Sequence, residues 1–175
     1  TTSVFETSVD LNAARGADLI VKLLSGGFTT HTLGRFRLSV TGDDRSTFAD
    51  GLANGGDVTA NWTVLNVTDV FSSNFSTTFS TLPDGSILTG GGVDEFEEYT
   101  VIARSALTTI TGIRLEALEH PSLPQDGPGR AGNGNYVVYE FDVSSRPRPI
   151  PEPASLSLIA LAGAGLMRLR GRRAA

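Results

Sequence analysis

Residues 136–143 read Tyr-Val-Val-Tyr-Glu-Phe-Asp-Val, and this stretch indicates the fold most clearly. In a β-strand, side chains two residues apart point to the same face, so an alternating pattern is typical of a half-buried strand. The stretch predicts one face formed by Val137, Tyr139, Phe141 and Val143. The opposite face would then carry Tyr136, Val138, Glu140 and Asp142.

The rest of the first 145 residues shows the same β character. The chain has 20 glycines and many Thr, Ser and Val residues, which favour strands and turns over helices. Pro83-Asp84-Gly85 and Gly90-Gly91-Gly92 are predicted turns, because glycine accepts positive φ. The other predicted strands are Asp18–Leu24, Leu33–Thr41, Asn61–Val67, Phe75–Thr81, Glu98–Ala103 and Thr109–Glu116. Many short strands separated by turns predict an all-β, antiparallel β-sandwich of the jelly-roll kind.

A weak internal repeat bears on the domain organisation. Residues 18–23 followed by 32–38 parallel residues 98–103 followed by 110–115, each pair ending in a strand with Gly and Arg-Leu. Residues 1–57 are therefore either the C-terminal part of a first β module or the N-terminal strands of a single sandwich. The remaining predicted units are a β-sandwich module (58–145), a stiff Pro/Arg linker (146–150) and a C-terminal tail (151–175).

The tail has three parts in a fixed order. It begins with Pro151, Glu152 and Pro153, and an apolar run follows that predicts a short hydrophobic helix. The apolar side chains of this run include Ala154, Leu156, Leu158, Ile159, Leu161 and Leu166. The chain then ends in a basic group formed by Arg168, Arg170, Arg172 and Arg173. The run is shorter than the roughly 20 residues that span a bilayer, and the arginines should stay cytoplasmic, so we expect a transient anchor with residues 1–150 outside.

This tail resembles the PEP-CTERM sorting signal of bacterial exported proteins. The Pro151-Glu152-Pro153 tripeptide is intact, and the order of tripeptide, apolar helix and basic end matches that signal. The resemblance implies recognition by an exosortase, a membrane peptidase that cuts near the tripeptide. The protein would be exported, held briefly in the membrane, and then released to the cell envelope or extracellular matrix.

Two segments of the body are similar to galactose-binding-like β-sandwich modules of large exported proteins of planctomycetes. Leu33–Thr41 resembles the closing strand of such modules. Residues 110–143 resemble a second segment, in which a strand precedes a long Pro- and Gly-rich loop and an edge strand. Tyr136 and Tyr139 stand where the resemblance would place Phe and a small hydroxyl residue. The resemblance implies a fold more than a ligand.

Composition restricts the classes of partner. There is no cysteine, so disulfides and thiolate metal sites are excluded. Residues 1–145 hold 8 basic and 18 acidic residues, a net charge of 8 − 18 = −10. Such a body argues against nucleic-acid binding and is compatible with structural calcium or with sugars. The chain begins Thr-Thr-Ser, without Met or a leader, so we expect a processed chain or a fragment.

Four residues are candidates for ligand binding. Trp62 is the only tryptophan, and it could either stack on a sugar ring or anchor the core. Arg130, Asn133 and Asn135 lie in the predicted long loop, where ordered loops often bind ligands. Residues 127–132 match G-x-G-x-x-G, but prolines precede them and a strand follows, so nucleotide binding is not expected. In the structural interpretation, Asn133 and Asn135 form local turns and Arg130 pairs with an acidic neighbour.

The sequence offers little for catalysis, and we expect no enzyme activity. His31 and His120 are isolated. Asp43, Asp44 and the group Glu95, Glu97 and Glu98 could serve acid–base chemistry or calcium, although turn residues and a solvated strand edge explain them better. The resulting hypothesis is a non-catalytic module that binds carbohydrate or matrix polymer. The alternatives are a purely structural envelope or biofilm component, or the accessory end of a larger exported enzyme.

Overall fold

The computed structural model describes residues 1–27, 30–48 and 61–147, and these form an all-β, sandwich-like fold with antiparallel pairing, as predicted. Two short 3-10 turns, η1 (Arg45–Thr47) and η3 (Pro124–Asp126), interrupt the loops. The strands are β1 (Thr2–Asn12), β2 (Ala17–Gly26), β3 (Arg35–Thr41), β4 (Thr63–Val64), β5 (Asn66–Ser72), β6 (Thr77–Thr81), β7 (Ile87–Gly91), β8 (Phe96–Ser105), β9 (Thr109–Ala117) and β10 (Val138–Pro147).

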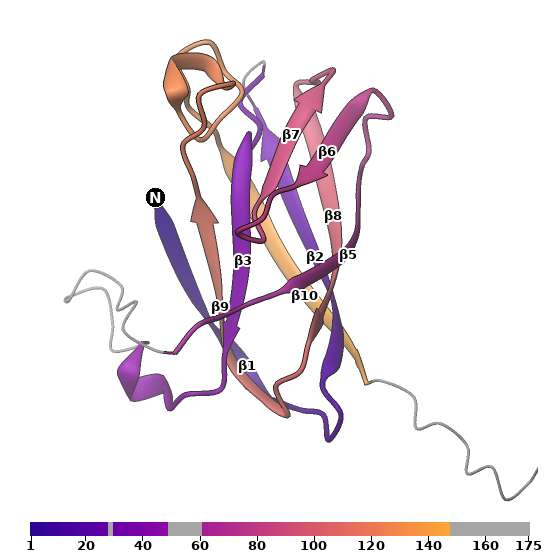
Figure 1. Ribbon diagram of the computed structural model, residues 1–175, viewed down its shortest axis with the longest axis vertical. Coiled ribbons are helices and arrows are strands. Elements are labelled where there is room, and N and C mark those ends of the chain that lie inside the picture. The colour runs from indigo at the N-terminus through magenta and orange to yellow at the C-terminus, as the bar shows by residue number, and fades with distance from the viewer. Residues whose placement is uncertain (28–29, 49–60, 148–175) are drawn as a thin grey trace, which may run out of the picture.

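The strands form two sheets that face each other (Figure 1). The first sheet has the order β1-β9-β3-β7-β6, with β4 also paired to β3, and the second has the order β10-β2-β8-β5. The loop after β9, residues 118–137, lies at one end of the two sheets, near the turns of β6 and β7 (Figure 1). The chain crosses repeatedly between the sheets, so most neighbouring strands are distant in sequence, although β6 and β7 form a hairpin.

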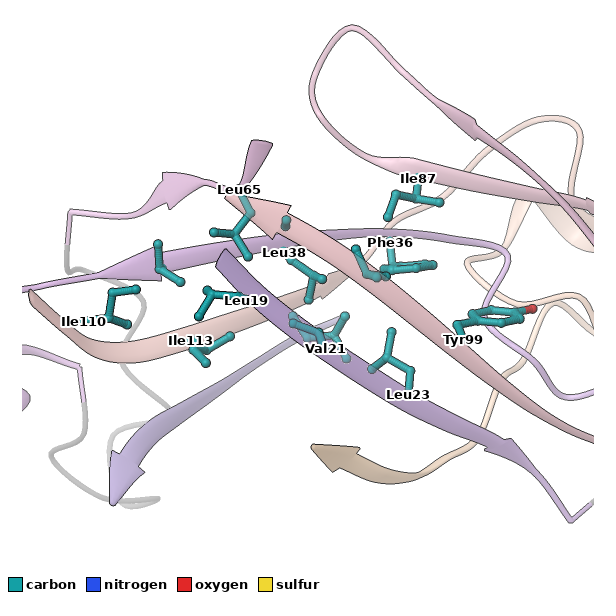
Figure 2. Packing of buried hydrophobic residues seen from close by; sticks show 14 of the residues in the cluster. Leu19, Val21, Leu23, Phe36, Leu38, Leu65, Ile87, Tyr99, Ile110 and Ile113 are labelled. Atoms are coloured by element: carbon teal, nitrogen blue, oxygen red, sulfur yellow. The ribbon is translucent and has the colours of Figure 1, made fainter. Parts of the chain in front are cut away.

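The core fills the space between the sheets (Figure 2). Alternate residues of β2 and β8 point inward from the second sheet, and alternate residues of β3 and β9 meet them from the first. Phe36 and Tyr99 stack across this interface with ring centroids 6.1 Å apart. The fully buried side chains of this cluster include Leu19, Val21, Leu23, Leu33, Phe36, Val40, Tyr99 and Val101. Burial of these apolar surfaces is the main favourable term in folding.

Several predicted strands agree closely with the structure. The predictions for β2, β3, β8 and β9 differ from the observed bounds by at most two residues at either end. The single strand predicted over 61–67 is instead divided between β4, which joins the first sheet, and the start of β5, which joins the second. The turn at Gly85 is confirmed, since its φ is +76°.

Two strands were not predicted. β1 is an edge strand whose pairing with β9 is interrupted between Glu6 and Leu11, so its pattern is irregular. β7 ends in Gly90 and Gly91, which pair with Thr78 and Thr77 of β6, and the prediction of a turn over both glycines was wrong. Strand pairing uses backbone groups, so glycine can take part where the neighbouring strand holds it. Only at Gly91 does φ reach +71°, where the strand ends.

The two halves of the internal repeat are neighbours in space. β2 pairs with β8 in the second sheet, and β3 pairs with β9 in the first. Each half therefore supplies one strand to each sheet, and equivalent strands lie antiparallel to one another. The predicted boundary between residues 57 and 58 lies outside the described residues. Each of the two sheets contains strands from before and from after this boundary.

β10 differs from its prediction in two ways. Its pairing with β2 shifts between Val138, opposite Ser25, and Glu140, opposite Leu24, which forms a β-bulge. The extra residue breaks the period of two. Tyr136 and Val138 pack against the core together with Phe141 and Val143, and Tyr139 is exposed. The predicted assignment of residues 136–139 to faces was therefore wrong, because the bulge shifts the alternation by one residue.

β10 also extends further than predicted. Arg146 and Pro147, assigned to the linker, pair with Asp18 and Ala17. A proline is tolerated in β10 because this is an edge strand, in which a residue without an N–H group need not interrupt the hydrogen bonding between strands. The remaining linker residues and the whole tail (148–175) lie outside the described residues. Among the residues that are described, no helix has the length and apolar character needed to cross a bilayer.

Candidate functional site

Trp62 lies against the outer surface of the first sheet. Its ring contacts the edge of Phe48, with centroids 5.6 Å apart and an interplanar angle of 71°. The Arg114 guanidinium lies over the indole face, 5.1 Å from the ring centroid. A cation over an aromatic face is attracted by the ring quadrupole. Trp62 is thus half-buried and engaged within the protein, as expected for a structural anchor.

The other three candidates lie at the opposite end of the sandwich. The Arg130 backbone N–H donates to the Thr32 carbonyl, just before β3, whereas Thr63, next to Trp62, pairs with Val40 near the end of β3. The length of β3 therefore separates Trp62 from Arg130, and the structure does not join the four candidates in one site. Within the loop, the Asn133 side chain accepts a hydrogen bond from the Asn135 N–H at 3.1 Å. This hydrogen bond confirms the prediction that Asn133 and Asn135 form a local turn.

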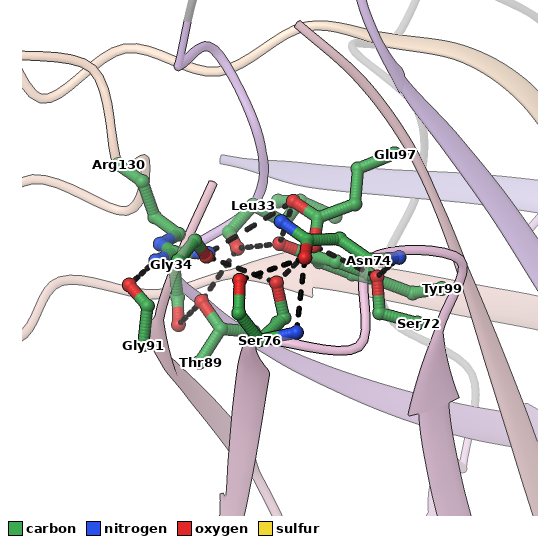
Figure 3. Close-up of polar contacts among 12 residues, drawn as sticks. Leu33, Gly34, Ser72, Asn74, Ser76, Thr89, Gly91, Glu97, Tyr99 and Arg130 are labelled. Carbon is green, nitrogen blue, oxygen red and sulfur yellow. Dashed lines mark hydrogen bonds and ion pairs between the residues drawn. The ribbon is translucent and has the colours of Figure 1, made fainter. Parts of the chain in front are cut away.

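Arg130 takes part in a buried polar cluster that the sequence did not indicate (Figure 3). Its Nη2 donates to the Gly91 carbonyl at 2.6 Å, and its Nη1 lies 3.9 Å from Glu97 Oε2. Glu97 is fully buried. Its carboxylate accepts hydrogen bonds from the hydroxyls of Ser72, at 2.7 Å, and of Thr77. The prediction that Arg130 pairs with an acidic residue is therefore confirmed, and the partner is Glu97.

This cluster connects separate elements of the fold. Ser72 ends β5, Thr77 begins β6, Glu97 belongs to β8, and Arg130 comes from the long loop. Below it, the Tyr99 hydroxyl donates to the Leu33 carbonyl at 3.2 Å, and burial raises the pKa of Tyr99. A buried charge is tolerated when it is paired and hydrogen-bonded, as Glu97 is here. Because these contacts join Arg130 to strands of both sheets, the cluster holds the loop in place.

The prediction that Glu95, Glu97 and Glu98 form a solvated strand edge was wrong for Glu97, which is fully buried. Glu97 has the same parity as Tyr99, Val101 and Ala103, all of which are buried. Glu98 has the opposite parity and is partly exposed. The period of two along β8 could have predicted that Glu97 faces inward.

The outer surface of the second sheet carries a different group of side chains. We call it the aromatic–carboxylate face and define it by Phe71, Phe96, Glu98, Tyr139, Glu140 and Asp142. Residues directly opposite one another in an antiparallel pair share a face. One row across the sheet runs from Glu98 through Leu24 to Glu140, and the next runs from Phe71 through Thr100 and Lys22 to Asp142. Successive rows are about 7 Å apart, two residues along each strand.

Phe96 and Tyr139 form the aromatic end of this face. Their rings stack with centroids 6.4 Å apart and an interplanar angle of 29°. The exposed fractions are 57% for Phe96 and 56% for Tyr139, so the pair is open to solvent. Gly26 and Gly27 lie beneath the rings, and a Cβ at Gly27 would overlap the Tyr139 hydroxyl. The bulge in β10 and the two glycines therefore bring the rings together.

The carboxylates of the face are only partly neutralised. Lys22 Nζ lies 3.0 Å from Glu98 Oε1 in an exposed ion pair. Among the described residues, neither Glu140 nor Asp142 has an ion-pair partner. A shallow hollow of about 260 Å³ is lined by Lys22, Leu24, Glu98, Glu140 and Asp142. Unpaired carboxylates here can accept hydrogen bonds from a ligand.

A larger groove opens between the edge strands β1 and β10. It has a volume of about 420 Å³ and reaches the buried side chains of Leu19, Ile110 and Ile113. Phe5 and Phe141 stack at this edge with centroids 4.5 Å apart. The groove exposes apolar core surface, and its two carboxylates, Glu6 and Asp10, already pair with Arg45. The aromatic–carboxylate face is therefore the better candidate site.

Metal and catalytic groups are sparse in the part of the chain that the structure describes. In residues 1–27, 30–48 and 61–147, no three His, Cys, Asp or Glu side chains gather as a metal site. His120 Nδ1 lies 2.7 Å from the Ser122 hydroxyl within a local turn. Asp44 caps η1 by accepting from the Ser46 N–H, and Asp43 accepts from Asn61. These acidic residues are turn residues, as predicted.

Comparisons with known proteins identify no relative. No protein-family model matches the chain, and no curated protein or solved structure matches it significantly. The candidate site is therefore assigned from the geometry and chemistry of the residues themselves.

Proposed function

We propose that the chain is a non-catalytic module that binds carbohydrate through the aromatic–carboxylate face. The observation that carries this proposal is the solvent-exposed stack of Phe96 and Tyr139 beside Glu140 and Asp142, which have no ion-pair partner among the described residues. Exposed large apolar groups on a sheet face are uncommon without a binding role when they cluster. The fold would be of the jelly-roll, galactose-binding-like type.

The chemistry of the face suits a sugar ring. One side of a pyranose ring presents C–H groups that pack against an aromatic ring, and its rim carries hydroxyls. The Phe96–Tyr139 pair would receive the ring, while Glu140 and Glu98, one row away, would accept hydrogen bonds from hydroxyls. Tyrosine contributes both an apolar face and a polar end to such contacts.

The proposal includes surface sorting. The Pro151-Glu152-Pro153 tripeptide, the apolar run and the four terminal arginines support cleavage by an exosortase after export. The tail would hold the chain in the membrane until cleavage, and the sandwich would then act in the cell envelope or extracellular matrix. A sugar-binding face facing outward would retain the released module on matrix polysaccharide.

Retention of the full chain on a panel of immobilised polysaccharides tests the proposal. We expect saturable retention by the native chain and at least about a fivefold loss of affinity for Phe96→Ala and for Tyr139→Ala, since stacking of a planar base on an aromatic side chain, the nearest analogue, contributes about 1–3 kcal/mol. Trp62→Ala is the matched aromatic control and should keep retention while it stays folded. Uniform non-binding by the folded native chain would contradict the proposal and favour a structural matrix component.

A further inference from the structure

The charge of the aromatic–carboxylate face restricts the kind of sugar that it can bind, and this inference rests on the function proposed above. The hollow beside the rings contains Lys22, Glu98, Glu140 and Asp142, a net charge of 1 − 3 = −2. The ion pair between Lys22 and Glu98 neutralises one carboxylate. Glu140 and Asp142 remain as the uncompensated charges.

The geometry separates these two charges. Glu140 and Asp142 are two residues apart on β10 and point to the same face, so their Cα atoms are about 7 Å apart. Both are exposed on an edge strand. A calcium ion needs oxygens at about 2.3–2.6 Å from its centre, about 5 Å across, and prefers more ligands than two separated carboxylates supply. Separate cationic groups along an extended ligand suit this spacing better.

The net charge of residues 1–145 also favours a cationic ligand. Residues 1–145 carry a net charge of 8 − 18 = −10. A surface of one sign raises the local concentration of ligands of the opposite sign and accelerates their association. It would repel polymers of uronic acids, while neutral sugars would gain nothing from it.

We propose that the ligand is a cationic polysaccharide, an amino-sugar polymer whose amino groups are at least partly free of acetyl groups. Its pyranose rings pack on Phe96 and Tyr139, and its ammonium groups pair with Glu140 and Asp142. The rings supply affinity for the sugar, and the two carboxylates supply the preference for the charged form. Exposed ion pairs contribute little free energy each, so the preference should be modest and sensitive to salt.

Binding of three hexamers to the full chain tests this assignment: glucosamine, N-acetylglucosamine and galacturonate hexamers, at low and at moderate salt. We expect the glucosamine hexamer to bind about three- to tenfold more tightly than its acetylated form, and the galacturonate hexamer to bind most weakly. The preference should shrink with added salt and as the pH is raised until the amines are neutral.

The double variant Glu140→Gln/Asp142→Asn identifies the residues responsible. It should bring the affinities for the glucosamine hexamer and the acetylated hexamer together, so that the preference for glucosamine disappears. Glu119→Gln/Asp126→Asn is the matched control, because it removes two exposed carboxylates of the loop after β9, which do not belong to the aromatic–carboxylate face, and changes the net charge equally. This control should keep the preference, and circular dichroism verifies that both double variants are folded.

The outcomes separate the two proposals. Equal binding of the glucosamine and acetylated hexamers would overturn the assignment of a cationic ligand while carbohydrate binding stands. A preference that survives Glu140→Gln/Asp142→Asn would overturn the assigned residues. No binding of any hexamer or immobilised polysaccharide would overturn the proposed function and this inference with it.

Discussion

The outer surfaces of the two sheets differ in how their charges are used. On the first sheet, Arg37 lies opposite Glu116 in the strand register, and their side chains form a two-pronged ion pair at 2.8 and 3.1 Å. Arg114 also contacts Glu116 at 3.2 Å, and its guanidinium is covered by Trp62. On the second sheet, the acidic residues face Leu24 and Lys22, and the aromatic rings are exposed.

The pKa values of Glu116 and Arg37 reflect the pairing of charges on the first face. Burial raises the pKa of Glu116, but the hydrogen bond from Arg37 and the charges of Arg114 and Arg37 outweigh it, so the pKa lies below its ordinary value. The hydrogen bond to Glu116 raises the pKa of Arg37. The first face is therefore neutralised internally and contributes to stability, whereas the second face is left available to a ligand. Carboxylates with protein partners are structural, and those without are candidates for binding.

The largest test of this distinction uses two adjacent glutamates of β8. Glu97→Ala removes the buried carboxylate and leaves Arg130 without its acidic partner, so we expect a loss of about 3–5 kcal/mol in the free energy of unfolding. Glu98→Ala removes an exposed partner of Lys22 and should cost less than about 0.5 kcal/mol. Urea denaturation measures both. Similar losses for the two variants would contradict the inward position of Glu97.

A second test compares one carboxylate from each outer face. Glu116→Ala removes the shared carboxylate partner of Arg37 and Arg114, which keep only weaker contacts with Asp84 at 3.7 Å and the Ser39 hydroxyl at 3.3 Å. We expect a loss of about 2 kcal/mol. Glu140→Ala removes an exposed carboxylate that pairs with no cation in the described part of the chain, and it should change stability by less than about 0.5 kcal/mol. Urea denaturation of the two variants side by side gives the difference. A stability loss for Glu140→Ala as large as that for Glu116→Ala would remove the contrast between the faces.

The aromatic residues of the two faces should separate stability from binding. Trp62→Ala removes contacts with Phe48 and Arg114, so we expect a loss of about 1–2 kcal/mol in unfolding free energy and unchanged polysaccharide retention. Phe96→Ala should cost less than about 1 kcal/mol and abolish retention. Thermal unfolding and retention are measured on the same preparations. Retention lost in Trp62→Ala but kept in Phe96→Ala would assign binding to the first face.

The smallest expected effect is a pH dependence of the first face. Hydrogen bonds from the Ser86 hydroxyl and N–H, with the nearby Arg35, lower the pKa of Asp84 to about 2. A lowered pKa means that the stabilisation is present above about pH 4 and is lost as the pH falls through about 2. Because Asp84 is partly exposed, we expect about 0.5–1 kcal/mol.

Asp84→Asn isolates this contribution. The variant should be less stable than the native chain at pH 6, and the difference should shrink as the pH falls through about 2 and disappear below it. Denaturation by urea at a series of pH values measures it. A constant difference at every pH would show that the effect of the substitution is not electrostatic.

The local pattern of the sequence was sufficient for much of the fold. The alternation along β2 and β8 identified both strands, because inward side chains must be apolar when two sheets enclose a core. β1 and β7 escaped prediction, since an interrupted edge strand and a glycine-rich strand carry little alternation. Of the candidate site residues, Arg130 was correctly paired with an acid, but its partner came from a strand more than 30 residues away.

The sequence by itself determined the β class, the acidic body and the three-part tail, because these follow from composition and short-range periodicity. Only the tertiary structure decided the candidate site. Tyr139 reaches Phe96 because β10 shifts register against β2, and Gly26 and Gly27 leave room for the two rings. A register is set by hydrogen bonds to a partner strand, and that partner lies more than 100 residues earlier in the chain, so no local pattern could encode which face Tyr139 would occupy.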